Sequence, residues 1–374
     1  MIQHRRVIFS VSIIDLLLLL LYSYLSLTIF YAQSLGLGLH LMVGLVVLLA
    51  SLIIIKIYAE PLSLDELRMT LAQAAKLFFV GSFLWYVTGC IAFYFFGYLS
   101  GTYDESKGFI GVQGLFLEGG VAPRFRGICD SPNNFGIYAM VLLPILLSYE
   151  RKLPFYMYAI ILVCILLTMS TTTYFACFIL ICVYLMRALL SLKAKQIASI
   201  VVLGVSIFAV VYLILNFFVD ESEIENFNEF AATRLARAET GSGRWELWEF
   251  TLNLIWNSPI FGYGLNQSRE LLLPLRNVQS THNSILELLI EGGAIALLFY
   301  LTLLVVCFFC ICSKVKNRHD KTWMLYSFIG SFVFSIANVL VYGDSFILML
   351  ALISVFLVKQ KHPQSTLREH AIDK

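Results

Sequence analysis

The sequence predicts an all-α polytopic membrane protein with about ten transmembrane helices, built as a single membrane domain over residues 1–374. Three observations lead to this fold class. The 374 residues are 59% hydrophobic and only 13% charged, whereas a soluble domain is about half apolar and about a quarter charged. The apolar residues form long runs, and one helical span needs about 20 of them. Charged residues separate these runs, as they do between membrane spans.

The apolar runs predict the spans in chain order. The first run follows His4-Arg5-Arg6 and is longer than the ~7–15 apolar residues of a secretory signal, so we expect an uncleaved helix. Residues 60–75 are predicted to form a separate amphipathic helix at the membrane surface. The expected spans are 7–32, 35–58, 77–99, 133–149, 154–170, 173–192, 197–219, 284–312, 322–341 and 345–358.

Basic residues orient these spans. Arg5 and Arg6 precede the first span, and further lysines and arginines gather in alternate loops, which places those loops and both termini in the cytoplasm. The outer side then carries a first loop at 100–132 and a large loop at 220–283. We expect the large loop to form a small helical subdomain, because no other extramembrane stretch is long enough.

Charge and cysteine content exclude other classes of protein. The net charge of +2 is too small to indicate binding to nucleic acid, so we expect no such partner. Of the eight cysteines, only Cys129 is expected on the outer side, so it has no partner for an intrachain disulfide. No spacing of cysteines and histidines matches a zinc site.

The outer basic residues differ in kind from the cytoplasmic ones. Nearly all are arginines, although charge near the outer ends of spans is disfavoured. Arginine grips phosphate or carboxylate with two donors at once, which predicts an anionic ligand. The alternative is pairing with the acidic run between Asp220 and Glu229. The outer basic residues are Lys107, Arg124, Arg126, Arg234, Arg237, Arg244, Arg269 and Arg276.

His282 is the one histidine expected on the outer side. Ser284 and Glu287 have the spacing of a capping box, so a span is predicted to begin there with His282 just outside it. An imidazole at this boundary can accept a proton near neutral pH, as a general base must. The alternative is a histidine that only hydrogen-bonds at a helix start. His40, inside the second span, is expected to be packed in the core.

Two further features lie close to His282. Residues 243–256 are predicted to form a helix on the outer membrane surface, with its apolar face made by Trp245, Trp248, Leu252 and Ile255. Arg244 opens this helix at the depth of lipid phosphates. Four ionisable residues are expected in or near the bundle, where such groups are functional candidates. They are Asp15, Glu287, Glu291 and Asp344.

The order of several short motifs resembles the bacterial O-antigen ligase and O-antigen polymerase superfamily over residues 120–300. Each motif is weak alone, and their order and shared outer side carry the resemblance. The motifs are Arg126-Gly127 with Ser131-Pro132-Asn133, Arg244-x-x-x-Trp248, Asn257-x-Pro259-x-x-Gly262-x-Gly264, His282-Asn283 and Glu291-Gly292-Gly293.

The resemblance implies a GT-C-like membrane glycosyltransferase of the bacterial inner membrane with a periplasmic active site. It implies metal-independent, inverting transfer of a glycan from undecaprenyl diphosphate, with no cofactor. Carried over, His282 is the catalytic base and Arg244 a diphosphate ligand, with Arg126, Arg124, Arg234 and Arg237 as further candidates. Asn283, Glu287 and Glu291 are expected to support the site. A metal site at His282 and the two glutamates is the alternative, but their spacing matches no standard ligand motif.

One departure bears on the acceptor. Ligases of this family carry an arginine in a Thr/Ser-x-Arg context at the outer end of a middle helix, where this chain reads Met169-Ser-Thr-Thr-Thr-Tyr174. Either another outer arginine replaces it in space or the acceptor differs. We therefore expect a polysaccharide polymerase that joins lipid-linked repeats, with a chain-length regulator as a candidate partner. The alternatives are an O-antigen ligase acting on lipid A core, and a flippase for the lipid-linked sugar.

Overall fold

The computed structural model describes residues 10–97, 109–118, 123–150, 153–189, 244–276 and 280–361. The expected span 197–219 and the candidate ligands Arg234 and Arg237 lie outside the described residues. The described elements are α1 (Ile13–Leu27), η1 (Thr28–Tyr31), α2 (Leu35–Ala59), α3 (Leu64–Phe96), β1 (Phe109–Val112), β2 (Leu115–Glu118), β3 (Arg124–Phe125), α4 (Pro132–Tyr149), α5 (Phe155–Leu167), α6 (Thr171–Leu189), α9 (Arg244–Asn257), α10 (Ser268–Arg276), α11 (Ser284–Lys314), α12 (Arg318–Ser335) and α13 (Asp344–Lys361).

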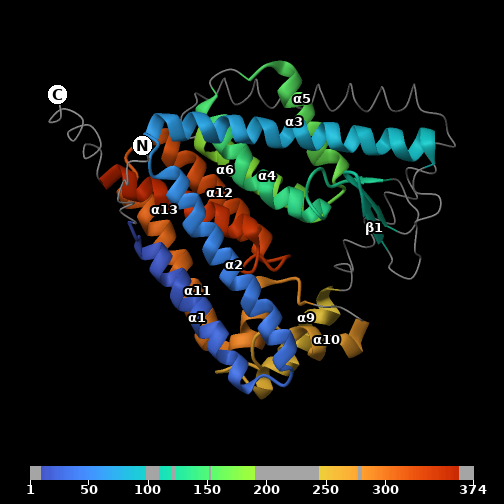
Figure 1. Cartoon of the computed structure of the whole chain (residues 1–374), viewed down its shortest axis with the longest axis vertical. Helices are drawn as coiled ribbons and strands as arrows, with labels where there is room; N and C mark the ends of the chain where they lie inside the picture. Colours follow the sequence, from blue (N-terminus) through green and yellow to red (C-terminus); the bar gives the residue numbers. More distant parts are fainter. Residues whose placement is uncertain are drawn as a thin grey trace, which may run out of the picture.

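The described chain is a mostly helical, multi-pass membrane protein. Four of its described helices are long and apolar enough to cross a membrane: residues 13–31, α2, α3 and α11. Helix α5 and residues 171–185 of α6 are shorter and equally apolar. Figure 1 shows α1, α2 and α11 running along one another, α3 crossing one end of the molecule, and α4, α6 and α12 between them. The expected total of about ten spans stays a prediction.

Helix α3 corrects the expected separation of a surface helix from the third span. It runs without interruption for 33 residues and takes in most of the 60–75 segment. Ser63 caps its start by accepting from the Glu66 amide, while Glu66 accepts from the Ser63 amide at 2.7 Å. No glycine or proline breaks the backbone hydrogen bonds where the amphipathic pattern becomes apolar, so one helix continues to Gly97.

The first outer loop holds a small sheet, which corrects the all-α prediction at this point. Strands β1, β2 and β3 pair antiparallel in that order. The β1–β2 turn has positive φ at both Gln113 (40°) and Gly114 (82°), as a two-residue hairpin requires. A Cβ on Gly89 of α3 would lie 2.1 Å from the Gln113 carbonyl oxygen, so only glycine lets the hairpin approach α3 this closely.

Helix α11 is interrupted in its outer third, where one continuous span was expected. Gly293 has φ 64° and ψ −163°, a conformation that other residues avoid. The loop after α9 replaces the lost helical hydrogen bonds, because the amides of Tyr263 and Gly264 each donate at 2.8 Å to the carbonyls of Ile290 and Glu291. The Ala294 amide donates in turn to Pro259 at 2.9 Å.

The connection before α13 is also longer than expected. The sequence predicts helix over 322–341, but α12 ends at Ser335. Residues 336–343 are not helical, and this segment returns to the start of α11 through the Leu340 amide, which donates to the Ser284 hydroxyl at 2.8 Å. It thereby carries Tyr342 and Asp344 to the same end of the bundle as His282.

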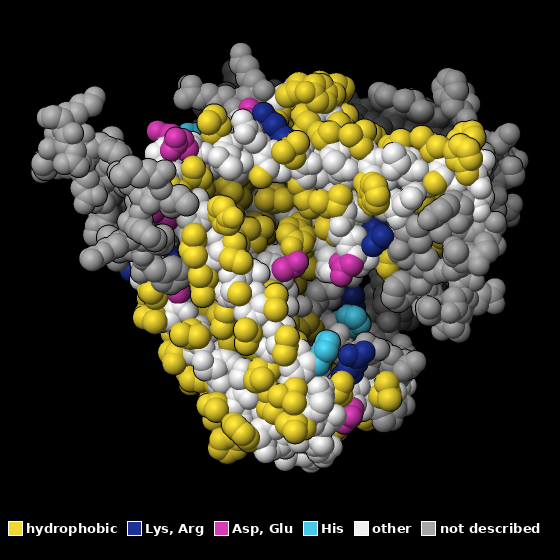
Figure 2. Space-filling model, viewed as in Figure 1, with side chains coloured by type: hydrophobic (Ala, Val, Ile, Leu, Met, Phe, Trp, Pro, Cys, Tyr) yellow, Lys and Arg dark blue, Asp and Glu magenta, His cyan; other side chains and the backbone are white. Residues whose placement is uncertain are grey.

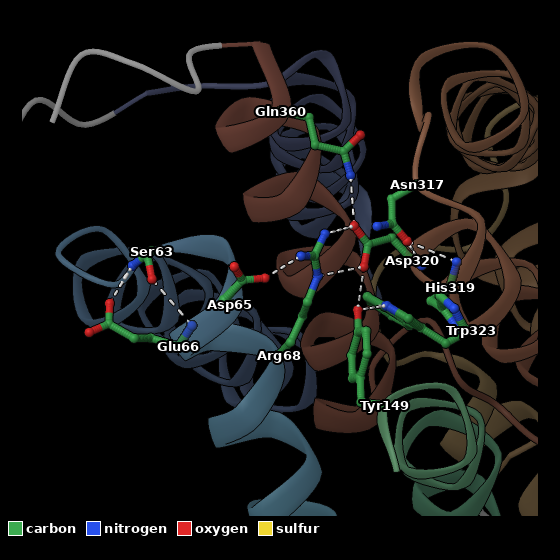
Figure 3. A network of polar contacts seen from close by, with 10 residues as sticks. All are labelled: Ser63, Asp65, Glu66, Arg68, Tyr149, Asn317, His319, Asp320, Trp323 and Gln360. Carbon is green, nitrogen blue, oxygen red and sulfur yellow. Dashed lines mark hydrogen bonds and ion pairs between the residues drawn. The ribbon is translucent and has the colours of Figure 1, made fainter. Parts of the chain in front are cut away.

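A buried polar network fastens the opposite end of the helices (Figure 3). Asp320 of α12 is fully buried and accepts from Arg68 of α3 at 2.7 and 3.0 Å and from the Tyr149 hydroxyl of α4 at 2.7 Å. Gln360 of α13 donates to the same carboxylate at 3.0 Å. Since a buried carboxylate is costly unless it is paired and hydrogen-bonded, this set of donors fixes four helix ends to one another.

A second buried ion pair joins three helices of the same end. Asp15 of α1 pairs with Lys56 of α2, and Ser354 of α13 contacts both at 3.0 Å. The ionisable Asp15 predicted from the sequence is therefore a packing contact between spans. Lys56, inside the expected span 35–58, is buried in this contact.

We expect Gly293→Ala to unfold the outer part of α11. The new Cβ would lie 2.1 Å from the Ile260 carbonyl oxygen and would hold a conformation that costs other residues about 1–3 kcal/mol. The measurement is the melting temperature in detergent, which should fall by several degrees. Gly81→Ala on α3 is the control, because nothing lies within 4 Å of its new Cβ. Equal melting temperatures for the two variants would contradict the assigned role of the break.

Candidate active site

The candidate site begins with the helix that docks onto the outer end of α11. Leu247, Thr251 and Ile255 form the buried face of α9, and the Trp248 indole donates to the Thr281 carbonyl at 3.0 Å. The expected apolar face is therefore only partly right, because Trp245 is 61% exposed. Trp245, Leu252 and Trp256 instead point away from the bundle, which is the side available to lipid headgroups.

This docking brings Arg244 and His282 together. Arg244 precedes Trp248 by one helical turn, and Trp248 binds the residue before His282. The imidazole is exposed, yet protein packed around it removes part of its hydration. Desolvation, followed by repulsion from the Arg244 guanidinium, lowers the pKa of His282 below its ordinary value of 6.5. Partial burial likewise lowers the pKa of Arg244.

His282 is held in an unusual backbone conformation. Its φ is 51°, in the left-handed region that few non-glycine residues occupy and that often marks functional positions. Asn283 begins the helix, because its side chain accepts from the amides of Ile285 and Leu286 at 2.9 and 3.2 Å. The predicted capping box of Ser284 is therefore wrong, although the helix does start at that residue.

Two fully enclosed carboxyl groups lie beneath His282. Glu287 accepts from the Thr281 amide at 2.8 Å, which fixes the residue next to the imidazole. Glu291 accepts from the Tyr342 hydroxyl at 2.6 Å. The Ser268 hydroxyl contacts Glu287 at 2.7 Å and Glu291 at 2.9 Å. One hydroxyl carries one proton, so the second of these contacts requires a proton on a carboxyl group.

Arg124 and Arg126 lie before α4, in the strand β3 and the turn after it. Arg124 donates to the carbonyls of Thr168 and Met169 at 2.9 and 3.4 Å, between α5 and α6. Arg126 donates to the carbonyls of Cys129 and Asp130 at 3.1 and 3.4 Å, and partial burial lowers its pKa. Both guanidinium groups thus donate to backbone carbonyls.

A chain of hydrogen bonds connects these segments to the start of α11. The Ser170 hydroxyl donates to Asn133 at 2.7 Å, and the Asn133 amide donates to the Asn338 side chain at 3.4 Å. The Asn338 carbonyl in turn accepts from the Ser284 hydroxyl at 3.0 Å. The outer ends of α4, α6, α11 and α12 are therefore joined through polar side chains.

A cavity of about 990 Å³ lies beside these helix ends. Its lining includes His40, Asp130, Asp344 and Tyr342. His40 is exposed at this cavity, so its expected place in the packed core is wrong. Figure 2 shows histidine and basic side chains facing acidic side chains on this side of the molecule, with a further basic side chain beside the acidic ones. Among the described residues, no group of three His, Cys, Asp or Glu side chains has an arrangement that could hold a metal ion.

Residues 156–301 match the family described as O-antigen ligase, and the match includes α9, α10 and the outer part of α11. This part of the chain is similar to the O-antigen ligase family, and the match covers less than half of the sequence. It is also similar to the ComP-specific O-oligosaccharyltransferase of Acinetobacter baylyi, with 24% identity over 226 residues. That similarity covers 56% of this chain and 40% of the length of the relative.

Packing explains the order of the glycine motifs in this chain. A Cβ on Gly262 would lie 2.6 Å from the Glu291 carbonyl carbon, and one on Gly293 would meet the Ile260 carbonyl oxygen. The glycines of the two motifs therefore let the loop after α9 lie against the broken α11. His40 and Asp130 were not predicted as site residues, because only the fold brings them to the cavity. Asp344 was predicted as an ionisable candidate in or near the bundle, without a place in the site.

We expect Glu287 to position the segment that holds His282. Glu287→Gln should keep near-wild-type activity, because a glutamine oxygen can accept from Thr281 and its amide can donate to Ser268. Glu287→Ala should lower kcat at least tenfold, since an unpaired buried amide costs about 1–3 kcal/mol. The measurement is turnover with donor at saturation, with the melting temperature as a check on folding. Equal losses in the two variants would contradict a positioning role for the acceptor oxygen.

Proposed function

We infer that this chain is a glycosyltransferase that takes a glycan from undecaprenyl diphosphate at the outer face of the bacterial inner membrane. The observation that carries the proposal is the juxtaposition of Arg244 and His282 at the outer end of α11. A cation beside a neutral imidazole suits a reaction in which a diphosphate leaves and a hydroxyl loses its proton.

In the proposed reaction the acceptor hydroxyl transfers its proton to His282, whose lowered pKa keeps it neutral and able to accept. The hydroxyl oxygen attacks the anomeric carbon of the donor glycan, and the bond from that carbon to the diphosphate oxygen breaks. The departing oxygen keeps the electron pair, and the Arg244 guanidinium stabilises its charge. Attack opposite to the leaving group inverts the anomeric carbon, and no metal or cofactor takes part.

The acceptor we favour is the sugar of another lipid-linked repeat, which makes the protein a polysaccharide polymerase. The stretch Met169–Tyr174 lacks the arginine of ligases, but Arg124 reaches the carbonyls of Thr168 and Met169 at this position. Arg124 therefore supports a second candidate, an O-antigen ligase that acts on lipid A core. The family description, O-antigen ligase, favours the same candidate.

A deletion strain complemented with variants tests the function. Loss of a polymerase leaves single repeats on the lipid core, whereas loss of a ligase leaves long chains on undecaprenyl diphosphate and none on the core. His282→Gln and Arg244→Gln should fail to restore the wild-type glycan ladder, with losses of about 10²–10⁴-fold for the base. His319→Gln, at the opposite end of the bundle, is the matched control.

The glycan ladder has outcomes that oppose the proposal. Wild-type chain lengths with His282→Gln would remove this residue from the mechanism. Purified protein that moves lipid-linked repeats across vesicles without forming new glycosidic bonds would identify a flippase. A deletion strain that loses only glycans on protein would identify a protein oligosaccharyltransferase.

The pH dependence of transfer should report His282. Because its pKa is lowered from 6.5, the imidazole is neutral at pH 7, and activity should fall only as the pH drops below about 6.5. Arg244→Gln removes a charge that repels the protonated imidazole, so the pKa of His282 should rise and the acid limb of the residual activity should move to higher pH. The measurement is kcat/KM from pH 5 to 8. An acid limb at the same pH in both proteins would contradict the coupling.

A further inference from the structure

The cavity lined by His40, Asp130 and Asp344 has walls of two kinds. Its volume of about 990 Å³ is in the range of ligand sites, which is about 300–1,000 Å³. One wall is polar and comes from the turn before α4 and the segment before α13. The other comes from α2 and is apolar apart from His40. The α2 wall includes Val43, Gly44 and Val47, and the rings of Tyr138 and Tyr342 also line the cavity.

The charge of the polar wall distinguishes between the two groups that a glycan transfer must bind, the diphosphate that leaves the donor and the sugar hydroxyl of the acceptor. Its charged side chains are the carboxylates of Asp130 and Asp344, and Arg126 nearby directs donors to the carbonyls of Cys129 and Asp130. Two carboxylates repel a diphosphate. They bind hydroxyl groups well, because a hydrogen bond to a charged acceptor is about twice as strong as a neutral one. Tyrosine rings add the apolar surface on which a sugar face can lie.

The apolar wall adds a second property of the ligand. Val43 is 60% exposed and Val47 is 57% exposed, and both belong to a helix long and apolar enough to span the membrane. The cavity wall is thus continuous with the surface that α2 presents to lipid. A ligand that fills the cavity meets hydroxyl-binding groups on one side and hydrocarbon on the other.

We propose that this cavity binds the acceptor, a hydroxylated sugar carried on a membrane lipid, with Asp130 and Asp344 accepting hydrogen bonds from its hydroxyls. The proposal rests on the proposed function. Tyr342 connects the cavity to the base, since it lines the cavity and donates to Glu291, one turn from the Glu287 that fixes Thr281. The acceptor therefore lies against the segment that holds His282.

The test separates donor from acceptor chemically. Purified wild-type protein receives its lipid-linked repeat as donor and an alkyl glycoside of the same repeat as acceptor. The glycoside lacks a diphosphate and can only accept. Asp130→Asn and Asp344→Asn should each raise the KM for the glycoside about tenfold, the factor expected for one charge-assisted hydrogen bond, while the KM for the donor stays unchanged.

The two asparagine variants preserve the local structure. Asp130 accepts from the Asn134 side chain at 2.5 Å and Asp344 accepts from the Ser345 amide at 2.8 Å, and an asparagine oxygen can accept both bonds. Asp65→Asn is the charge-matched control, because Asp65 is an exposed carboxylate at the opposite end of the bundle. Its KM for the glycoside should equal the wild-type value.

A volume test uses Gly44 in the α2 wall. A Cβ there meets only the Leu41 side chain, at 3.9 Å, so Gly44→Leu fills the cavity without a backbone clash. It should raise the glycoside KM at least tenfold. Gly36→Leu on the same helix places the same side chain in open space away from the cavity and should leave KM unchanged.

The outcomes distinguish the site from the function. Product from the wild type with an unchanged glycoside KM in both asparagine variants overturns the acceptor site alone, as does a rise in the donor KM instead. Absence of product with every acceptor overturns the proposed function. A raised KM for the repeat glycoside alone supports the site and assigns it to polymerisation, whereas a raised KM for a lipid A core saccharide alone supports the site and assigns it to ligation.

Discussion

The outer part of the molecule depends on the interruption of α11 at Gly293. A continuous helix would satisfy its own backbone and leave no amides or carbonyls for a loop to bind. The break leaves the carbonyls of Ile290 and Glu291 free to accept hydrogen bonds from the loop after α9. These hydrogen bonds hold the loop, and with it α9, against the start of α11. Arg244 lies near His282 only because α9 docks there. The backbone conformation of Gly293, which is distant from both side chains, therefore determines that they lie together.

The buried carboxyl groups depend on the same geometry. Glu287 and Glu291 lie one turn apart on the outer part of α11, facing Ser268 from the segment that α9 leads into. Burying two carboxylates without cations in hydrocarbon would cost a prohibitive free energy. Hydroxyl and amide groups that donate to these two side chains, together with a proton on one of them, lower that cost. As a result two hydrogen bonds fix Thr281: its amide donates to Glu287, and its carbonyl accepts from the Trp248 indole.

The sequence was a good guide where a local pattern decides the structure. The apolar runs located α2, α4, α6 and α13 to within a few residues. The outer placement of Arg244 and His282 stays a prediction from the pattern of charge. It failed where distant segments decide. The hairpin at Gln113-Gly114 depends on the close approach to Gly89, and the break at Gly293 depends on the carbonyl of Ile260. His40 lies in an apolar run, and only the assembled fold shows that it is exposed at a cavity.

Charged side chains of opposite sign lie in two different regions of the outer face. Arg244 and His282 lie on the α9 side, and the carboxylates of Asp130 and Asp344 lie at the cavity beside α2 and α4. Under the proposed function the sign of the fixed charge sorts two groups to different places: the anionic diphosphate of the donor and the neutral sugar hydroxyls of the acceptor. Like charges in a poorly solvated site repel strongly. Tyr342 and Glu291 lie between the two regions, and the Tyr342 hydroxyl donates to Glu291. Under the proposed function this hydrogen bond fixes the position of the acceptor cavity relative to the segment that holds His282.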